Sequence, residues 1–270
     1  MKLRPSEGAA AATVFGRAMR AAGRLGGQPL ARLRDAVAPG LSRPPKNGDG
    51  FPAYARHAAA LNVDVNDWIE GNLGWVPALP ILEDMIFPLL SPTAHVCEVG
   101  VGTGRWSRHI ADRIPAGRLI LADRTPWEAN FLRSYFADRP NVEVVLCDGV
   151  RLPLIQDGWA DLFFSQGMFV ALKLGHLYVY VCEFARCLKP GGWVVFDFID
   201  PETPDGWAFL LKEAPGSPLV FTYHSLSSVV KCFHAAGLEL EGTKIIGKST
   251  YVIGRKPELS PAQARLDPIR

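Results

Sequence analysis

The sequence contains no apolar run near the roughly 18–20 residues that a membrane-spanning helix needs, and its N-terminus lacks the apolar segment of a secretory signal peptide. Cysteine is scarce, odd in number and never spaced CxxC, so neither a disulfide framework nor a zinc knuckle is indicated. No His/Asp/Asn set has metal-ligand spacing either. We therefore expect a cytoplasmic protein without a metal, whose reduced and mostly buried cysteines are Cys97, Cys147, Cys182, Cys187 and Cys232.

Basic residues are few in most of the chain. Residues 1–46 hold nine Lys or Arg against Glu7 and Asp35, which leaves 20 basic and 25 acidic residues for positions 47–270. An acidic body argues against an extended nucleic-acid surface, because affinity for a phosphate backbone comes mostly from Lys and Arg on one face. Nucleic acid is therefore not an expected partner of the body, and an RNA substrate would have to engage the basic arm.

The basic arm, residues 1–46, is rich in Ala, Gly and Arg. Four of its apolar residues fall at helical spacing with arginines between them: Phe15, Met19, Ala22 and Leu25. This composition suits a weakly docked extension, an organelle-targeting presequence or an anchor to an anionic surface. The alternative to a cytoplasmic location is therefore a protein that is targeted, or attached to a surface, through this arm.

The rest of the chain has the composition of one globular domain, with 48% hydrophobic and 21% charged residues in total. A turn-rich stretch, residues 42–52, separates the arm from it. We divide the remainder into a helical lead-in at 47–92 that we expect to be a substrate lid, a core at 93–257 and a tail at 258–270. Within the core, residues 201–225 form an insert expected on the substrate side.

Short apolar runs alternate with amphipathic segments through the core. The predicted strands are His95–Val99, Leu119–Ala122, Val142–Cys147, Asp161–Phe164 and Trp193–Phe198. Near-continuous hydrophobic strands joined by helices predict a doubly wound α/β fold with a mostly parallel sheet and helices on both faces. Two last runs, Leu238–Ile246 and Thr250–Arg255, are separated by a tight turn and predict an antiparallel hairpin.

Residues 94–111, AHVCEVGVGTGRWSRHIA, are a strand, a glycine-rich turn and the start of a helix. Glycines at such a turn let a ligand lie against bare backbone at the carboxyl edge of the sheet. The spacing is GxGxG, which is neither the dinucleotide GxGxxG nor a Walker loop. The next three strands also end in polar groups, at Asp123, Asp148 and Ser165. Each carboxylate alone is as well explained as a helix cap, but their joint placement at one edge predicts a ligand site.

With these motifs in order, residues 75–256 resemble the class I S-adenosylmethionine-dependent methyltransferases. The likeness is carried by ExGxGxG from Glu98, Asp123 after the second strand, Asp148-Gly149 after the third and LKPGGWVVFD from Leu188. It implies a Rossmann-like sheet of seven strands with the last antiparallel. It also implies S-adenosylmethionine as the cofactor and S-adenosylhomocysteine as the product.

The resemblance implies a role for each residue of the turn and strand ends. Glu98 would orient the cofactor's amino group, directly or through water, while Gly100 and Gly102 line its methionine arm. Asp123 would hold the ribose and Asp148 the adenine amino group with Gly149 nearby. The amino-acid end would contact Ser165 or Gln166, and Gly104 and Arg124 complete the cofactor-binding set.

A catalytic base is less well marked. Many small-molecule members of the family have a His about where Ala171 stands, so that role does not transfer. An alcohol acceptor needs a base to remove its proton, and the candidates are His176, Asp200 and His224. The alternatives are a surface position for His176 and a turn or cap for Asp200. Four aromatics are candidate substrate contacts, or equally parts of an ordinary lid core: Tyr54, Trp75, Trp207 and Tyr223.

The acceptor expected from this reading is a hydroxyl of a small molecule or glycan. The sequence lacks the Asn/Asp-Pro-Pro-aromatic tetrad used on exocyclic amines, and it lacks the Pro-Cys nucleophile used on cytosine. N-methylation of a small amine remains open, as does a catalytically silent cofactor-binding scaffold that acts as a partner subunit. A homodimer is also possible.

Overall fold

The computed structural model describes residues 44–46, 48–213 and 220–258. The basic arm up to residue 43, positions 214–219 of the predicted insert and positions 259–270 of the predicted tail lie outside the described residues. No helix in the described part of the chain is long and apolar enough to cross a membrane.

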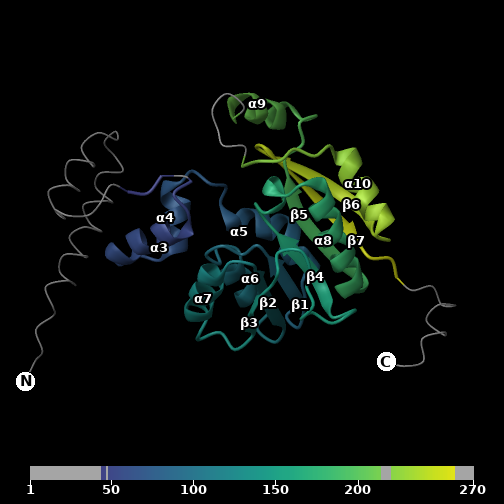
Figure 1. Ribbon diagram of the computed structural model, residues 1–270. Helices are drawn as coiled ribbons and strands as arrows, with labels where there is room; N and C mark the ends of the chain where they lie inside the picture. The colour runs from purple at the N-terminus through teal and green to yellow at the C-terminus, as the bar shows by residue number, and fades with distance from the viewer. Residues whose placement is uncertain (1–43, 47, 214–219, 259–270) are drawn as a thin grey trace, which may run out of the picture.

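A seven-stranded sheet with helices on both faces forms the centre of the molecule (Figure 1). The strand order is β3-β2-β1-β4-β5-β7-β6. Strands β1 to β5 pair in parallel, whereas β7 is antiparallel to β5 and to β6. The predicted doubly wound sheet and C-terminal hairpin are confirmed. The strands are β1 (His95–Val99), β2 (Arg118–Asp123), β3 (Val142–Leu146), β4 (Ala160–Ser165), β5 (Leu188–Phe198), β6 (Glu239–Ile246) and β7 (Ser249–Arg255).

The chain runs outward from β1 through β2 to β3 and then returns to place β4 on the other side of β1. The carboxyl ends of β1 and β4 therefore form a topological switch point. Doubly wound sheets bind ligands in the crevice at such a point. The helices are α3 (Phe51–Ala60), α4 (Val65–Asn72), α5 (Ala78–Ile81), α6 (Ser107–Arg113), α7 (Pro126–Tyr135), α8 (Leu174–Cys187), α9 (Pro204–Glu213) and α10 (Leu226–Ala235).

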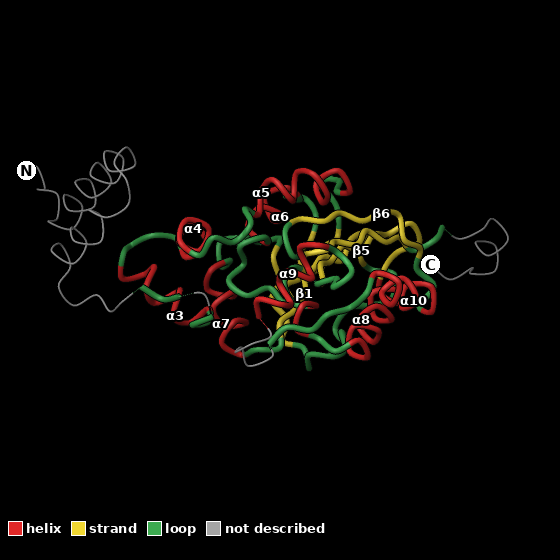
Figure 2. The backbone as a smooth tube through the Cα atoms, turned by 90° about the horizontal axis from the view of Figure 1, so that it is seen from above, coloured by secondary structure: helices red, strands yellow, loops and turns green. Residues whose placement is uncertain are grey.

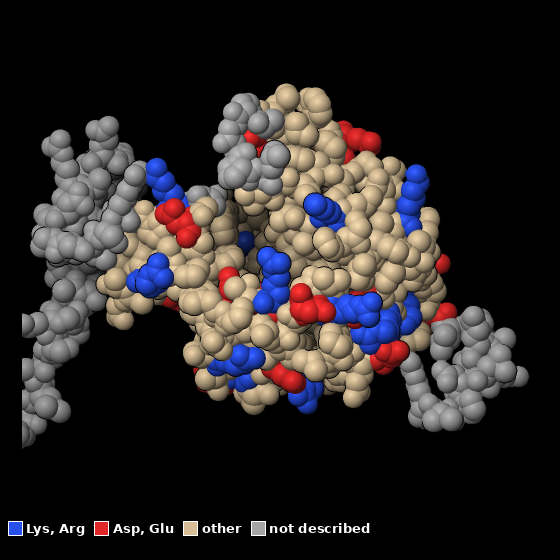
Figure 3. Space-filling model, in the orientation of Figure 1, with Lys and Arg blue, Asp and Glu red and all other residues tan. Residues whose placement is uncertain are grey.

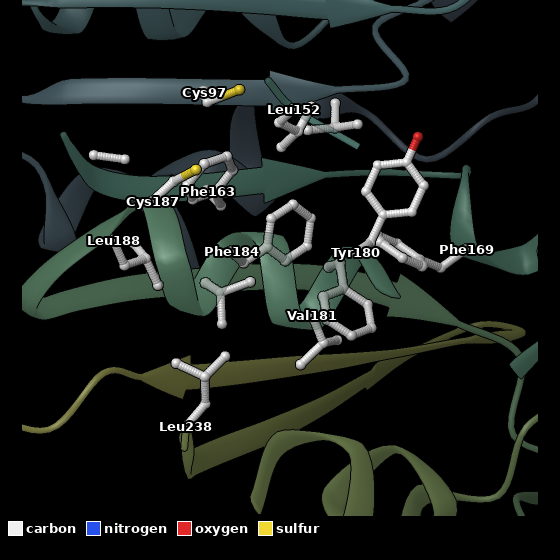
Figure 4. Packing of buried hydrophobic residues seen from close by; sticks show 14 of the residues in the cluster. Cys97, Leu152, Phe163, Phe169, Tyr180, Val181, Phe184, Cys187, Leu188 and Leu238 are labelled. Atoms are coloured by element: carbon white, nitrogen blue, oxygen red, sulfur yellow. The ribbon is translucent and has the colours of Figure 1, made fainter. Parts of the chain in front are cut away.

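Two hydrophobic clusters hold these layers together, one on each face of the sheet. Helices α8 and α10 cover one face, where Phe163 of β4 stacks on Phe184 of α8 with ring centroids 4.7 Å apart (Figure 4). Helices α5, α6 and α7 cover the other face, where Trp106 packs on Phe164. Figure 2 shows α5 and α6 on one side of the strands and α8 and α10 on the other. Since successive strand residues point to opposite faces, both clusters draw on the same strands.

The helical lead-in expected from the sequence consists of several short helices. It breaks into α3 and α4, since Asn62 adopts a positive φ of 53° and Asp64 caps α4 by accepting the N–H groups of Asn66 and Asp67. The segment after α5 continues as a π-helix, η1 (Leu82–Ile86), and a 3₁₀ turn, η2 (Phe87–Leu89). Pro88 lies in that 3₁₀ turn and has no N–H to continue a helix.

The LKPGG segment precedes the strand predicted at Trp193–Phe198, but in the structure it is itself the first part of β5. Leu188 pairs with Ala160 and Trp193 with Leu162, so the segment forms an irregularity in the pairing of β4 and β5. Gly191 takes a φ of 78°, a left-handed value that glycine adopts without strain. The Pro-Gly-Gly sequence of this segment favours a turn. Pairing with the neighbouring strand β4 overrides that preference.

Candidate active site

The glycine-rich turn follows β1 and is shaped for close approach. Gly100 and Gly102 have φ values of 73° and 63°. A Cβ at Gly102 would lie 2.7 Å from the Phe51 ring, and one at Gly100 would lie 2.9 Å from the Met168 side chain. Any larger residue would therefore be strained in its backbone and would collide with a neighbour. The third glycine, Gly104, packs against α7, where a Cβ would meet Phe136.

Asp123, at the end of β2, is hydrogen-bonded to the backbone of this turn. Its Oδ2 accepts the backbone N–H of Val101 at 3.1 Å and that of Gly102 at 3.5 Å, and its Oδ1 accepts the N–H of Thr125 at 2.9 Å. The side chain is almost fully buried. Oδ1 accepts only one of these bonds and so has a further lone pair. Asp123 can therefore both shape the turn and accept a hydrogen bond from a ligand.

A cavity of about 470 Å³ opens beside Asp123. It extends from the end of β3 across the glycine-rich turn to the start of α8, and Figure 3 shows this face hollowed between the lead-in helices and the body of the domain. Five of the predicted cofactor-binding residues line it: Gly100, Gly102, Asp123, Arg124 and Gly149. The structure thus brings together residues that are up to 49 positions apart in the chain.

The other five predicted cofactor-binding residues do not line the cavity. Glu98 is buried and accepts a hydrogen bond from Ser107, and burial raises its pKa to about 8. Ser165 is buried and donates to the carbonyl of Val99, and Gln166 is half-buried. Gly104 packs on α7, as described above.

Asp148 is exposed and caps its own turn. Its Oδ1 accepts the N–H groups of Arg151 and Val150, and these bonds lower the pKa of the carboxyl. Gly149 next to it has a φ of 83° and lines the cavity, with the Arg124 side chain packed over it. At the end of β3, Cys147 and Gly149 therefore line the cavity, whereas the Asp148 carboxylate does not.

Of the three candidate bases, His176 alone lines the cavity. It is exposed and lies in the first turn of α8, close in sequence to Ala171, which also lines the cavity. Asp200 accepts the N–H groups of Glu202 and Leu226, so its carboxylate caps a turn and the start of α10. His224 is buried, and its Nε2 lies 2.8 Å from the carbonyl oxygen of Leu172.

The predicted substrate aromatics also lie outside the cavity lining. Tyr54 is buried in the lead-in, where its hydroxyl accepts the N–H of Gly48 and donates to the carbonyl of Lys46. Trp75 packs beside Tyr54 and faces the guanidinium of Arg105. Trp207, on α9, is half exposed, and Tyr223 is half-buried.

The cavity has further lining residues that the sequence analysis did not select. Phe51 comes from the lead-in, Glu128 from the first turn of α7, and Lys173 from the position before α8. Glu128 could have been noticed as the last residue of a Thr-x-x-Glu capping pattern. For Phe51 and Lys173 no local signal exists. The remaining lining residues are Val99, Ala122, Thr125, Cys147, Gly167, Met168, Leu172 and Tyr180.

These residues fit the cofactor that the sequence resemblance implies. Backbone without side chains at Gly100 and Gly102 accommodates a flexible arm, and a buried carboxylate at Asp123 suits a pair of ribose hydroxyls. Glu128 adds an orphaned acceptor, since its Oε2 is buried without a hydrogen-bond partner among the described residues. Burial also raises the pKa of Glu128. No group of three His, Cys, Asp or Glu in the described ranges could hold a metal ion.

Residues 96–192 match a family model described as "Methyltransferase domain". Over 203 residues the chain is 26% identical to a malonyl-[acyl-carrier protein] O-methyltransferase of Marinomonas sp. (strain MWYL1), a match that covers 68% of this chain and 74% of that protein. A protein of the same name from Methylococcus capsulatus is 30% identical over 105 residues, which are 39% of this chain and 37% of that protein.

Among solved structures, a methyltransferase of Haloferax volcanii in complex with the Trm112 methyltransferase activator has a TM-score of 0.60 and 19% identity, over 77% of this chain and 98% of that one. At this identity the likeness shows the fold. The glycine-rich turn, the strand order and the matching family model all indicate a methyltransferase. Residues 96–192 are therefore a methyltransferase domain, and the chain has the Rossmann-like fold of the class I S-adenosylmethionine-dependent methyltransferases.

Proposed function

We propose that this methyltransferase acts on an oxygen atom of a small acceptor, and in the first instance on a hydroxyl group of a small molecule or glycan. The observation that carries the proposal is His176, an imidazole in the wall of the same cavity that the glycine-rich turn lines. No described residue pairs with its ring, so it is available to an acceptor. Both curated relatives are named O-methyltransferases, which supports oxygen as the attacked atom.

The cofactor supplies a methyl group that is already activated for transfer, so the chain needs mainly to bind, align and exclude water. We assign Asp123 to the ribose hydroxyls and the backbone at Gly100 and Gly102 to the methionine arm. Gly149 and Cys147 would border the adenine. In this arrangement a ring nitrogen of His176 accepts the proton of the acceptor hydroxyl as the oxygen attacks.

A carboxylate acceptor is the second candidate, and a specific observation favours it. Lys173 and Arg124 also line the cavity, and neither forms an ion pair with any described residue. The two curated relatives carry malonyl in their names, and a malonyl group ends in a carboxylate. A carboxylate is ionised at neutral pH, so it needs a cation to hold it rather than a base to deprotonate it.

Transfer of a radiolabelled methyl group into a panel of metabolites, polysaccharides, acyl thioesters, amines and RNA tests the proposal. Label in an alcohol or sugar, stable to mild alkali, supports the hydroxyl acceptor. Label that alkali releases as methanol identifies a methyl ester and hence a carboxylate acceptor. Label only in amines or RNA would overturn an oxygen acceptor of either kind.

His176→Asn separates the two oxygen acceptors. It removes the base and retains a polar side chain, so turnover of an alcohol would fall by a factor of about 10²–10⁴. His234→Asn, at an exposed histidine in the last turn of α10 that does not line the cavity, is the matched control. If both variants keep full activity toward an alcohol, His176 is not the base.

The silent-scaffold alternative predicts a different result. A chain that binds S-adenosylmethionine by calorimetry but labels no pool would favour a partner subunit over an enzyme with an unidentified acceptor. The Haloferax volcanii neighbour was solved as a complex with an activator protein, so the panel should also include cell extract that can supply such a protein.

A further inference from the structure

The lead-in helices form a small aromatic core of their own. Tyr54 of α3 and Trp68 of α4 pack with ring centroids 5.8 Å apart, and Ile69 is fully buried beside them. Phe51 stands at the edge of this cluster, edge-to-face with Tyr54 at 6.1 Å and with Trp75 at 6.2 Å. The orientation of the Phe51 ring is thus set by neighbours within the lead-in.

This small core is anchored directly on the glycine-rich turn. Asn66, which is fully buried, accepts the hydroxyl of Thr103 at 2.6 Å and donates to the Thr103 carbonyl at 3.0 Å. Outside this pair, Arg108 forms ion pairs with Asp64 and Asp67 of the lead-in. A buried polar pair joined by two hydrogen bonds specifies one arrangement, because breaking it would leave hydrogen-bonding groups without partners away from water.

The consequence of this anchoring is the position of Phe51. The tip of its ring lies against Gly102, so that a Cβ there would be 2.7 Å from it, and the ring is part of the cavity wall. Asp123 accepts the N–H groups of Val101 and Gly102 in the same turn. The Phe51 ring therefore borders the cavity beside the turn to which Asp123 is hydrogen-bonded.

The sulfonium of S-adenosylmethionine joins the ribose 5′-carbon to the methionine arm. With the ribose at Asp123 and the arm along Gly102, as proposed above, the positive charge falls between them and beside Phe51. A cation within about 6 Å of an aromatic ring face is attracted by the ring quadrupole. We propose that Phe51 is a cofactor-binding residue whose ring favours the cationic substrate form of the cofactor over its neutral thioether product. The inference rests on the proposed placement of the cofactor.

Phe51→Leu tests this, because it retains an apolar side chain and removes the π face. We would measure dissociation constants by calorimetry for three ligands: S-adenosylmethionine, neutral S-adenosylhomocysteine, and sinefungin, which carries an ammonium near the sulfonium position. Relative to S-adenosylhomocysteine, both cationic ligands should weaken by about two- to five-fold, the factor equivalent to about 0.5–1 kcal/mol. Phe131→Leu is the matched control, since Phe131 packs at the border of the same cluster without lining the cavity.

Equal weakening of all three ligands would overturn the proposal, because Phe51 would then contribute only apolar contact. Unchanged affinities would overturn it too. Circular dichroism and thermal unfolding establish that both variants are folded before the comparison is made. If the unaltered protein binds none of the three ligands, the failure lies with the cofactor placement itself, and that outcome is seen before any variant is compared.

Discussion

Ser107 donates a 2.6 Å hydrogen bond to Oε2 of Glu98 beneath the glycine-rich turn, where both side chains are buried. This bond joins the end of β1 to the first residue of α6, the two elements that the turn connects. Burial raises the pKa of Glu98 to about 8, although the Ser107 bond acts in the opposite direction. The Glu98 carboxyl, the first residue of the ExGxGxG motif, therefore binds a proton more tightly in the folded protein than it would in water.

The first prediction concerns the pH dependence of stability. The folded pKa of Glu98 lies above its value of about 4.5 in the unfolded chain. The folded state thus binds the proton more tightly, and the stabilisation is complete below pH 4.5 and is lost as pH rises toward 8. Glu98→Gln cannot ionise, so the variant should gain stability relative to the unaltered protein across this range, by on the order of a few kcal/mol.

Urea unfolding of both proteins at pH 5, 6.5 and 8 measures this difference. Glu83→Gln, an exposed glutamate in η1, serves as the control and should leave the pH profile unaltered. Parallel profiles for the unaltered protein and the Glu98→Gln variant would show that Glu98 is ionised in the fold.

The second prediction concerns Asp123. Asp123→Ala should weaken both S-adenosylmethionine and S-adenosylhomocysteine by about 10- to 100-fold, because hydrogen bonds to a charged group contribute about 1.5–3 kcal/mol. Asp161→Ala is a matched control: Asp161 also accepts a backbone N–H, that of His95, but at the opposite edge of the sheet. Calorimetry that finds equal affinities in the two variants would remove Asp123 from the cofactor site.

The third prediction compares two glycines with similar backbone conformations. Gly102 and Gly247 have φ values of 63° and 55°, but a Cβ at Gly247 would meet no atom within 4 Å. Alanine at either position should cost about 1–2 kcal/mol of stability through left-handed backbone strain. Gly102→Ala should in addition lose cofactor affinity, because its methyl group would displace Phe51. Thermal unfolding and calorimetry separate the two effects, and retained affinity in Gly102→Ala would contradict the close approach proposed at this turn.

The fourth prediction distinguishes the two oxygen acceptors through Lys173. For a carboxylate acceptor, Lys173→Gln should raise KM by about three- to five-fold with little change in kcat, since an accessible ion pair contributes up to about 1 kcal/mol. For a neutral alcohol KM should not move. Lys231→Gln, at an exposed lysine on α10 outside the cavity lining, provides the control. Steady-state kinetics with an acceptor from the labelling panel gives the result.

Local signals in the sequence were sufficient for the core of the fold. Strands β1 to β4 were predicted to within about two residues at each end, because continuous apolar runs can be buried on both faces only in a parallel sheet. The glycine-rich turn and Asp123 were identified for the same reason, since strand ends and turns have their own chemistry. The predicted role of Glu98 remains a prediction, and its burial beside Ser107 is what the sequence did not reveal.

By itself the sequence therefore determined which strands form, which turn lies at the carboxyl edge of the sheet and which carboxylate stands beside it. Only the tertiary structure decided which side chains surround the cavity. Phe51 reaches Gly102 across 51 positions through the Asn66–Thr103 pair, and Lys173 reaches the cavity from the position before α8. No periodicity or spacing encodes such contacts, because they depend on how separate elements pack against one another.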